Sequence, residues 1–164
     1  MIKLIVLDVD GCLTDGKIIY DNNGLESKQF NVKDGFGIKS WLRLGNEVAI
    51  ITGRDSQIVT NRAKELGITH LYQGVKDKHA ILLNILNTLN ISLKEVAAIG
   101  DDLNDHKILS QVGRSFTPND AVLEVRQEVQ TVLERKGGDA VVREMIDQLV
   151  EENNQKEQYL GFWL

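Results

Sequence analysis

The chain has 164 residues, 42% of them hydrophobic and 26% charged, which suits a single globular domain with a core of its own. Its formal net charge is −5 and its Lys and Arg residues form no block, so nothing in the sequence predicts binding to nucleic acid or to an anionic membrane. No apolar run approaches the roughly 20 residues that cross a bilayer, the start does not resemble a signal peptide, and Cys12 is the only cysteine, so we expect a cytoplasmic protein without an internal disulfide.

Strand-like and helix-like segments alternate along the chain. The strand-like segments are short runs rich in Ile, Val and Leu, whereas the helix-like segments repeat apolar residues every three or four positions. Two strand-like segments flank the turn-rich stretch 21–24, a pattern typical of a β-hairpin. In chain order, the predicted elements are a strand at 3–8, hairpin arms at 17–20 and 26–31, a helix at 35–44, a strand at 47–52, a helix at 56–66, a strand at 69–73, a helix at 78–90, a very short helix opened by Ser92, a strand at 96–100, a helix at 104–112, a strand at 114–117, a helix at 121–128, a strand at 129–133 and a helix at 139–152.

This alternation predicts an α/β fold, a Rossmann-like parallel sheet with helices on both faces. The hairpin at about 17–31 interrupts the alternation directly after the first strand, and no linker or internal repeat divides the chain. We therefore expect one domain over residues 1–153, followed by a tail at 154–164 that is first polar and then abruptly apolar.

Charged and hydroxyl-bearing residues follow four of the predicted strands, at the point where each strand ends. They are Asp8 and Asp10 after the first strand, Thr52 and Arg54 after the second, Lys76, Asp77 and Lys78 after the third, and Asp101, Asp102 and Asp105 after the fourth. Ligands of open α/β sheets bind beyond the carboxyl ends of the strands, so we expect these side chains to meet at one edge. Crowded carboxylates raise one another's pKa unless a cation compensates, and Mg²⁺ prefers carboxylate and phosphate oxygens. The set predicts metal-assisted phosphoryl transfer, in which an aspartate can itself attack phosphorus.

Four short motifs carry a resemblance to a known superfamily. They are DVDGCLTDG (8–16), Thr52, Lys78 and GDDLND (100–105), and they stand in the order typical of haloacid dehalogenase phosphatases. Further stretches resemble a family of small, cap-less members, the 3-deoxy-D-manno-octulosonate 8-phosphate (KDO 8-phosphate) phosphatases: FNVKDGFGIK (30–39), AIITGR (49–54), GITHLYQG (67–74) and GGDAVVRE (137–144). The resemblance covers nearly the whole chain up to about residue 150, and it implies a small hairpin flap where relatives carry a cap domain.

The resemblance implies catalytic roles for the first two aspartates. Asp8 matches the nucleophile, and Asp10 matches the general acid that protonates the leaving alkoxide and then serves as base for the hydrolytic water. Mg²⁺ is the implied cofactor, held by Asp8, by Asp101 and by the backbone carbonyl of Asp10. The alternative for Asp8 and Asp10 is that they belong to a solvated turn or cap a helix, but this alternative leaves the other motifs unexplained.

Phosphate binding is implied for Thr52 and Lys78, whose hydroxyl and ammonium groups can follow charge as it spreads over phosphoryl oxygens. Without the resemblance, Lys78 is equally well interpreted as a solvent-exposed residue at the start of a helix. Asp102 is expected to bind metal through water or to orient a ligand, and Asp105 to anchor its loop. An acidic first helical turn explains any one of these aspartates, but not the set.

Substrate contacts are implied for a larger set of positions. These are Asp10, Asn31, Val32, Lys33, Asp34, Gly35, Lys39, Arg54, Arg62, Lys78 and Asn104. Arg54 and Arg62 lie about two helical turns apart, and a guanidinium group suits the carboxylate of a sugar acid. Taken alone, Arg62 is also well interpreted as an ordinary surface residue. Among the positions in this set, Lys39 matches the substrate-binding positions of the resembled family least well.

As a whole, the resemblance implies Mg²⁺-dependent hydrolysis of KDO 8-phosphate to KDO and phosphate on the route to lipopolysaccharide. It also implies a homotetramer whose hairpins meet in a central contact. One alternative is a phosphatase for a nine-carbon acid, such as KDN 9-phosphate or N-acylneuraminate 9-phosphate, and another is a non-catalytic regulatory homologue. Arg54 and Asp34-Gly35 favour the eight-carbon substrate, and the presence of both Asp8 and Asp10 opposes the regulatory role.

Two features near the C-terminus remain. The stretch YLGFWL (159–164) is too apolar to extend freely into water, and we expect it to dock at an active site, as the resembled family implies. Ala140 stands where the family usually has glycine, which predicts an altered turn near the cover of the site.

Overall fold

The six strands of the central sheet are all parallel and lie in the order β5-β4-β1-β6-β7-β8. The computed structural model describes residues 1–164. Its strands are β1 (Leu4–Leu7), β4 (Glu47–Ile51), β5 (His70–Tyr72), β6 (Val96–Ile99), β7 (Arg114–Thr117) and β8 (Thr131–Val132). The predicted parallel α/β sheet is confirmed.

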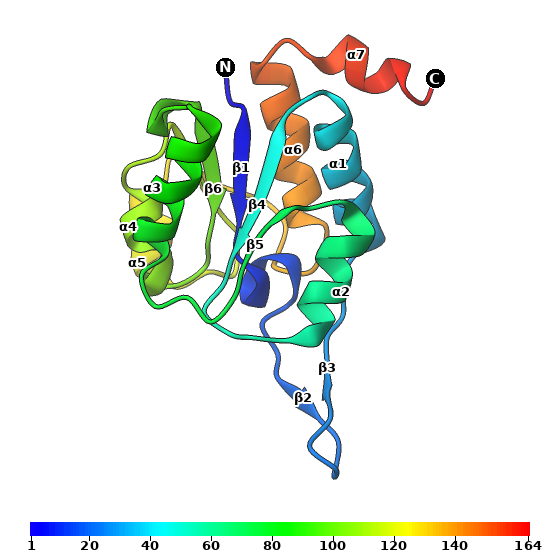
Figure 1. The fold of residues 1–164 in the computed structure, drawn as a ribbon, viewed down its shortest axis with the longest axis vertical. Coiled ribbons are helices and arrows are strands. Elements are labelled where there is room, and N and C mark those ends of the chain that lie inside the picture. The colour runs from blue at the N-terminus through cyan, green and yellow to red at the C-terminus, as the bar shows by residue number, and fades with distance from the viewer.

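Helices cover both faces of this sheet, with α1, α2 and α6 on one face and α3, α4 and α5 on the other (Figure 1). Their bounds are α1 (Val32–Arg43), α2 (Gln57–Leu66), α3 (Lys78–Leu89), α4 (His106–Leu109), α5 (Leu123–Glu128), α6 (Val141–Glu152) and α7 (Lys156–Gly161), with shorter helical turns η1 (Val9–Leu13), η2 (Leu93–Glu95) and η3 (Leu103–Asp105). None of the helices has the length and apolar character needed to span a membrane.

Strand β1 alternates its side chains between two apolar cores. Ile5 and Leu7 join the core under α1, α2 and α6, whereas Leu4 and Val6 join the core under α3, α4 and α5. Because both faces are covered, every residue of β1 is buried and the strand reads as one apolar run. This central strand, which is paired on both sides, ends directly before Asp8 and so fixes the position of its backbone.

Several element boundaries differ from the sequence prediction. Helix α1 begins at Val32 rather than at 35, because the Asn31 side chain caps it by accepting a hydrogen bond from the Lys33 amide at 2.9 Å. The predicted helix at 104–112 is a 3₁₀ turn followed by the single turn of α4, since Asp105 turns its side chain into the site. The predicted strand at 129–133 pairs only over β8, which is an edge strand with one neighbour.

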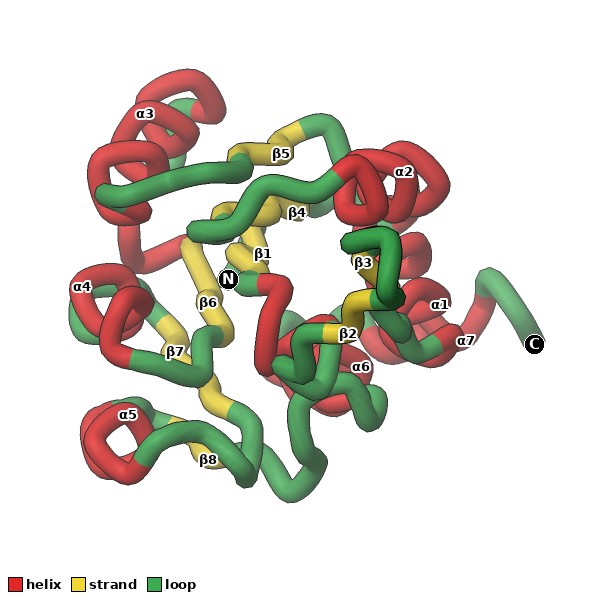
Figure 2. The backbone as a smooth tube through the Cα atoms, turned by 90° about the horizontal axis from the view of Figure 1, so that it is seen from below, coloured by secondary structure: helices red, strands yellow, loops and turns green.

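The predicted hairpin projects beyond the carboxyl ends of the sheet strands (Figures 1 and 2). Its paired parts are short, with β2 (Ile19–Tyr20) antiparallel to β3 (Glu26–Ser27). Ile19, Tyr20 and Leu25 are exposed on it. A two-stranded hairpin is marginal by itself, and gathered apolar side chains on a projecting element are typical of a contact surface.

The C-terminal segment forms helix α7 at the end of the sheet opposite the hairpin, beside the N-terminus (Figure 1). Tyr159 is buried in the core, the rings of Trp163 and Phe36 lie 4.5 Å apart, and the guanidinium of Arg43 lies 4.3 Å from the Phe162 ring centroid. The expectation of an apolar segment that docks is met, but its partner within the chain is α1 and not the chain's own carboxyl-end site.

Ala140 adopts the left-handed conformation, with φ 62° and ψ 31°, at the entry to α6. This conformation costs an L-residue roughly 1–2 kcal/mol and costs glycine nothing comparable. The chain therefore keeps a turn of the kind that glycine favours, and carries the strain at a buried alanine.

Candidate active site

A polar cavity of about 480 Å³ opens at the carboxyl ends of the central strands, the end that faces the viewer in Figure 2. No apolar side chain lines it. The lining residues are Asp8, Asp10, Gly16, Thr52, Gly53, Arg54, Asp101, Asp102 and Asn104. Residues that follow β1, β4 and β6 thus meet at one place, as the sequence pattern predicts.

The turn after β1 is built to present Asp8 and Asp10. The Thr14 hydroxyl accepts hydrogen bonds from the Gly11 and Gly16 amides, at 3.4 and 3.1 Å, and so braces the turn. Gly11 has a φ of 94°, and a Cβ there would stand 1.9 Å from Oδ2 of Asp101. Glycine at this position therefore allows the Asp101 carboxylate to lie directly against the turn.

Lys78 joins two of the carboxylates from the first turn of α3. Its buried ammonium donates to Asp8 Oδ1 at 2.9 Å and to Asp105 Oδ1 at 2.6 Å. Burial lowers the pKa of Lys78, but the charges and hydrogen bonds of the two aspartates outweigh burial and raise it overall, so Lys78 remains a cation. Asp105 makes no helix cap, and its contact in this structure is with Lys78.

The carboxylate cluster carries more negative charge than Lys78 balances. Burial, followed by the charges of neighbouring aspartates, raises the pKa of Asp101 to about 7. Burial and the charge of Asp8 likewise raise the pKa of Asp105 to about 6, and burial raises that of Asp8. Oδ2 of Asp105 is buried without a hydrogen-bond partner. A bound cation stabilises a cluster of buried carboxylates of this kind, because it compensates their mutual repulsion.

The donor atoms fit a magnesium ion. One carboxylate oxygen of Asp8, one of Asp101 and Sγ of Cys12 lie within 4.8 Å of one another. Burial, and after it the charges of Asp8, Asp101 and Asp105, raises the pKa of the Cys12 thiol well above its usual value. A neutral thiol is a poor ligand, so the two carboxylates are the donors that remain, and they are of the kind that Mg²⁺ prefers.

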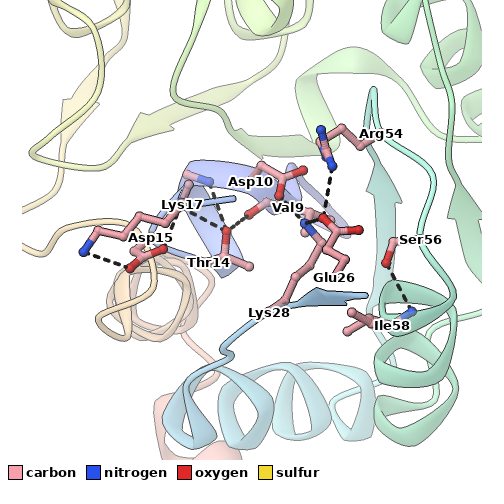
Figure 3. A network of polar contacts seen from close by, with 12 residues as sticks. Val9, Asp10, Thr14, Asp15, Lys17, Glu26, Lys28, Arg54, Ser56 and Ile58 are labelled. Carbon is pink, nitrogen blue, oxygen red and sulfur yellow. Dashed lines mark hydrogen bonds and ion pairs between the residues drawn. The ribbon is translucent and has the colours of Figure 1, made fainter. Parts of the chain in front are cut away.

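A second charged cluster connects the hairpin to this cavity (Figure 3). Lys28 donates to Asp10 Oδ1 at 2.6 Å and lies 3.2 Å from Glu26 Oε1, and its side chain is only 1% exposed. Glu26 also binds the Arg54 guanidinium at 3.1 Å, which in turn donates to the Tyr20 hydroxyl at 3.1 Å. Burial lowers the pKa of Lys28, but its bonds to Asp10 and Glu26 raise it overall. Nothing in the sequence indicates a role for Lys28, whose only local signal is an acid two residues away.

The predicted positions on or beside α1 do not line the cavity within one chain. Asn31 and Gly35 adjoin Arg62, which donates to the Asn31 carbonyl oxygen at 3.4 Å. Asp34 is buried and accepts a hydrogen bond from the Arg143 amide at 2.8 Å. The remaining predicted positions, Val32, Lys33 and Lys39, are exposed and do not line the cavity.

Gly137 approaches the catalytic turn so closely that a Cβ would lie 2.0 Å from the Gly11 carbonyl oxygen and 2.9 Å from that of Thr14. We expect Gly137→Ala to displace the turn, to lower kcat at least roughly tenfold and to destabilise the protein by about 1–3 kcal/mol, the usual cost of overpacking. Phosphate release and thermal unfolding measure the two effects. Gly161→Ala is the matched control, because a Cβ there meets no atom within 4 Å; equal effects of the two substitutions contradict the prediction.

Comparison with known sequences gives two results. A sequence model of the haloacid dehalogenase-like hydrolases matches residues 70–145. The 3-deoxy-D-manno-octulosonate 8-phosphate phosphatase of Escherichia coli K12 is 45% identical over 149 residues, which are 91% of this chain and 79% of that protein.

Solved structures of proteins with the same name are similar throughout. The Yersinia pestis structure superposes with a TM-score of 0.93 and 42% identity, covering 95% of this chain and 84% of the other. The Moraxella catarrhalis structure, solved with magnesium, phosphate and KDO, also has a TM-score of 0.93, with 40% identity over 98% of this chain and 93% of the other.

Proposed function

We propose that this chain, which belongs to the 3-deoxy-D-manno-octulosonate 8-phosphate phosphatase family of haloacid dehalogenase-like hydrolases, hydrolyses KDO 8-phosphate to KDO and inorganic phosphate. The observation that carries the reaction type is the cluster of charges at the carboxyl ends of the central strands. Asp8 and Asp101 line the cavity with raised pKa, and the buried Lys78 binds Asp8 at 2.9 Å. The intact cluster opposes a purely regulatory role.

Asp8 is the nucleophile of the proposed reaction. One of its carboxylate oxygens attacks phosphorus while the bond between phosphorus and the sugar oxygen breaks, which gives an aspartyl-phosphate and free KDO. Lys78 holds the Asp8 carboxylate through Oδ1 and so fixes the direction of attack. The rigid strand β1 behind Asp8 serves the same purpose.

Asp10 is the acid and base. Its proton passes to the sugar oxygen as the alcohol leaves, and the resulting carboxylate then takes a proton from water as that water attacks the aspartyl-phosphate. This second step releases phosphate and restores both aspartates. Asp10 lines the same cavity as Asp8, as both steps require.

The phosphoryl group is assigned to Thr52, which follows β4 and lines the cavity, and to Lys78, which contacts Asp8 at 2.9 Å. Asp8 and Asp101, with the backbone carbonyl of Asp10, are the residues that would hold Mg²⁺. When bound, the ion offsets the repulsion between the anionic nucleophile and the phosphate. The raised pKa of Asp101 is the local feature that supports a cation at this position.

Arg54 and Asn104 are the proposed contacts for the sugar acid at the rim of the cavity. The second group of substrate positions does not line the cavity in one chain, and consists of Asn31–Gly35, Lys39 and Arg62. We assign these positions to a site shared with a neighbouring subunit. A homotetramer joined through the hairpins is the proposed assembly, and the exposed Ile19, Tyr20 and Leu25 support it. The proposed setting is the cytoplasm, on the route to lipopolysaccharide.

A substrate panel tests the function. Phosphate release is measured from KDO 8-phosphate, from a nine-carbon keto-acid 9-phosphate and from glucose 6-phosphate, with Mg²⁺ and with EDTA. We expect kcat/KM for KDO 8-phosphate to exceed the others roughly 100-fold or more, and EDTA to abolish release. A preference for the nine-carbon acid would establish the alternative substrate, and no release from any ester would establish the regulatory homologue.

A further inference from the structure

Lys28 lies behind the proposed acid and base, on the arm of the hairpin that returns to α1. Its ammonium donates to Asp10 Oδ1 at 2.6 Å, and this is the one hydrogen bond that any side chain makes to the Asp10 carboxylate. Lys28 is not among the residues that line the cavity. Figure 3 shows its side chain passing between Asp10 and Glu26.

The burial of Lys28 is unusual for a lysine. Its side chain is 1% exposed, although lysine is almost never fully buried unless it is paired. Burying an ammonium group is unfavourable unless carboxylates compensate its charge, and here Asp10 and Glu26 supply two. Glu26 is itself bound to Arg54, so the hairpin is tied to two residues that line the cavity, Asp10 and Arg54.

We propose that Lys28 is a positioning residue that holds the Asp10 carboxyl group in the orientation required for proton transfer to and from the reacting oxygens, which makes the hairpin part of the active site of its own chain. The proposal rests on the assignment of Asp10 as acid and base. The Asp10 side chain is 20% exposed at the edge of the cavity, where more than one staggered rotamer is open to it. The hydrogen bond from Lys28 selects one of these rotamers. Proton transfer needs a heavy-atom separation near hydrogen-bond length, so the selected orientation matters to the rate.

This role predicts an effect that depends on the leaving group. An alkoxide such as that of KDO must be protonated as it departs, whereas p-nitrophenolate departs without a proton. Formation of the aspartyl-phosphate from p-nitrophenyl phosphate therefore does not need a correctly placed Asp10. Hydrolysis of that intermediate needs Asp10 as base with either substrate.

The test compares Lys28→Met with the wild-type protein on two esters. With KDO 8-phosphate, we expect kcat to fall about 10- to 100-fold, with KM changed less than about threefold. With p-nitrophenyl phosphate, the rate of the first-turnover burst of nitrophenolate is expected to stay within about threefold of wild type, while the steady state that follows slows as on the sugar ester. The retained burst also shows that the variant is folded.

Two further variants complete the design. Lys28→Arg keeps the cation and is expected to recover most of the lost kcat, whereas Lys17→Met removes an exposed hairpin lysine and is expected to change nothing. An unchanged kcat on KDO 8-phosphate in Lys28→Met overturns the proposal, and so does an equal loss of both the burst and the sugar-ester rate. If the wild-type protein gives the burst but does not cleave KDO 8-phosphate, the proposed substrate is wrong. The kcat of Lys28→Met is then compared with that of the wild-type protein on the alkyl phosphate of the panel that is cleaved.

Discussion

Asp8→Asn is expected to lower phosphate release at least roughly 10⁴-fold, because an amide oxygen in place of the carboxylate cannot form the aspartyl-phosphate. The substitution preserves the shape of the side chain at the end of β1, and Lys78 retains Asp105 as a partner at 2.6 Å. The loss is therefore expected in kcat rather than in folding. Phosphate release under Mg²⁺ and intact mass after acid quenching measure it, since we expect the wild-type protein to gain one phosphoryl group during turnover and the variant to gain none.

Asp55→Asn is the matched control, because Asp55 is exposed and does not line the cavity. We expect it to keep wild-type turnover and phosphoryl-enzyme formation. Appreciable activity in Asp8→Asn would transfer the nucleophile's role to another group, and the proposed reaction course would be wrong even if KDO 8-phosphate were the substrate.

The sheet and the position of the site could be predicted because the sequence encodes both locally. The apolar run of β1 requires cover on both faces, and the alternation of strands and helices brings the carboxyl ends of the strands to one edge. Asp8, Thr52 and Asp101 meet there for that reason. Their meeting depends on topology alone, and not on the details of any side-chain packing.

Contacts that depend on how separate elements pack could not be predicted in this way. Lys28 finds Asp10 only because the hairpin folds back over the turn after β1, and no periodicity in the sequence marks that pair. Helix α7 depends likewise on the face that α1 offers to it, where Phe36 and Arg43 contact the terminal aromatic residues. The start of α1 could have been found from Asn31, which is a good N-cap residue.

The substrate positions matched on or beside α1 show a different limit of prediction from sequence. Asn31, Gly35 and Arg62 lie against one another, but none of them lines the cavity. A sequence resemblance records which residues meet a substrate, but not which copy of the chain supplies them. The proposed site shared between subunits would explain why these positions do not line the cavity of one chain.

Asp101→Asn is expected to abolish Mg²⁺-dependent activity and, in the absence of metal, to stabilise the protein. The folded-state pKa of Asp101 is raised from 3.8 to about 7, first by burial and then by the charges of Asp8, Asp105 and Asp102. The folded protein therefore holds this proton more tightly than the unfolded chain does, so the stability of the metal-free protein falls as the pH rises toward about 7. Asparagine removes the repelling charge, and we expect Tm in EDTA above that pH to rise by about 2–4 °C, the shift that 1 kcal/mol produces in a domain of this size.

The same variant separates the metal site from simple charge repulsion. Saturating Mg²⁺ is expected to raise the Tm of the wild-type protein, since a ligand that binds only the folded state stabilises it, and to leave Asp101→Asn unchanged. The fall of Tm in EDTA as the pH rises from about 4 to about 7, the range between the ordinary and the raised pKa of Asp101, is expected to be weaker in the variant. Thermal melts with and without Mg²⁺, with Asp55→Asn as control, measure both effects. A carboxylate that is kept in order to bind a cation lowers the stability of the protein whenever the cation is absent. A lower Tm for Asp101→Asn in EDTA would therefore show that Asp101 stabilises the fold instead. A Tm response to Mg²⁺ equal to that of the wild-type protein would show that Asp101 does not hold the ion.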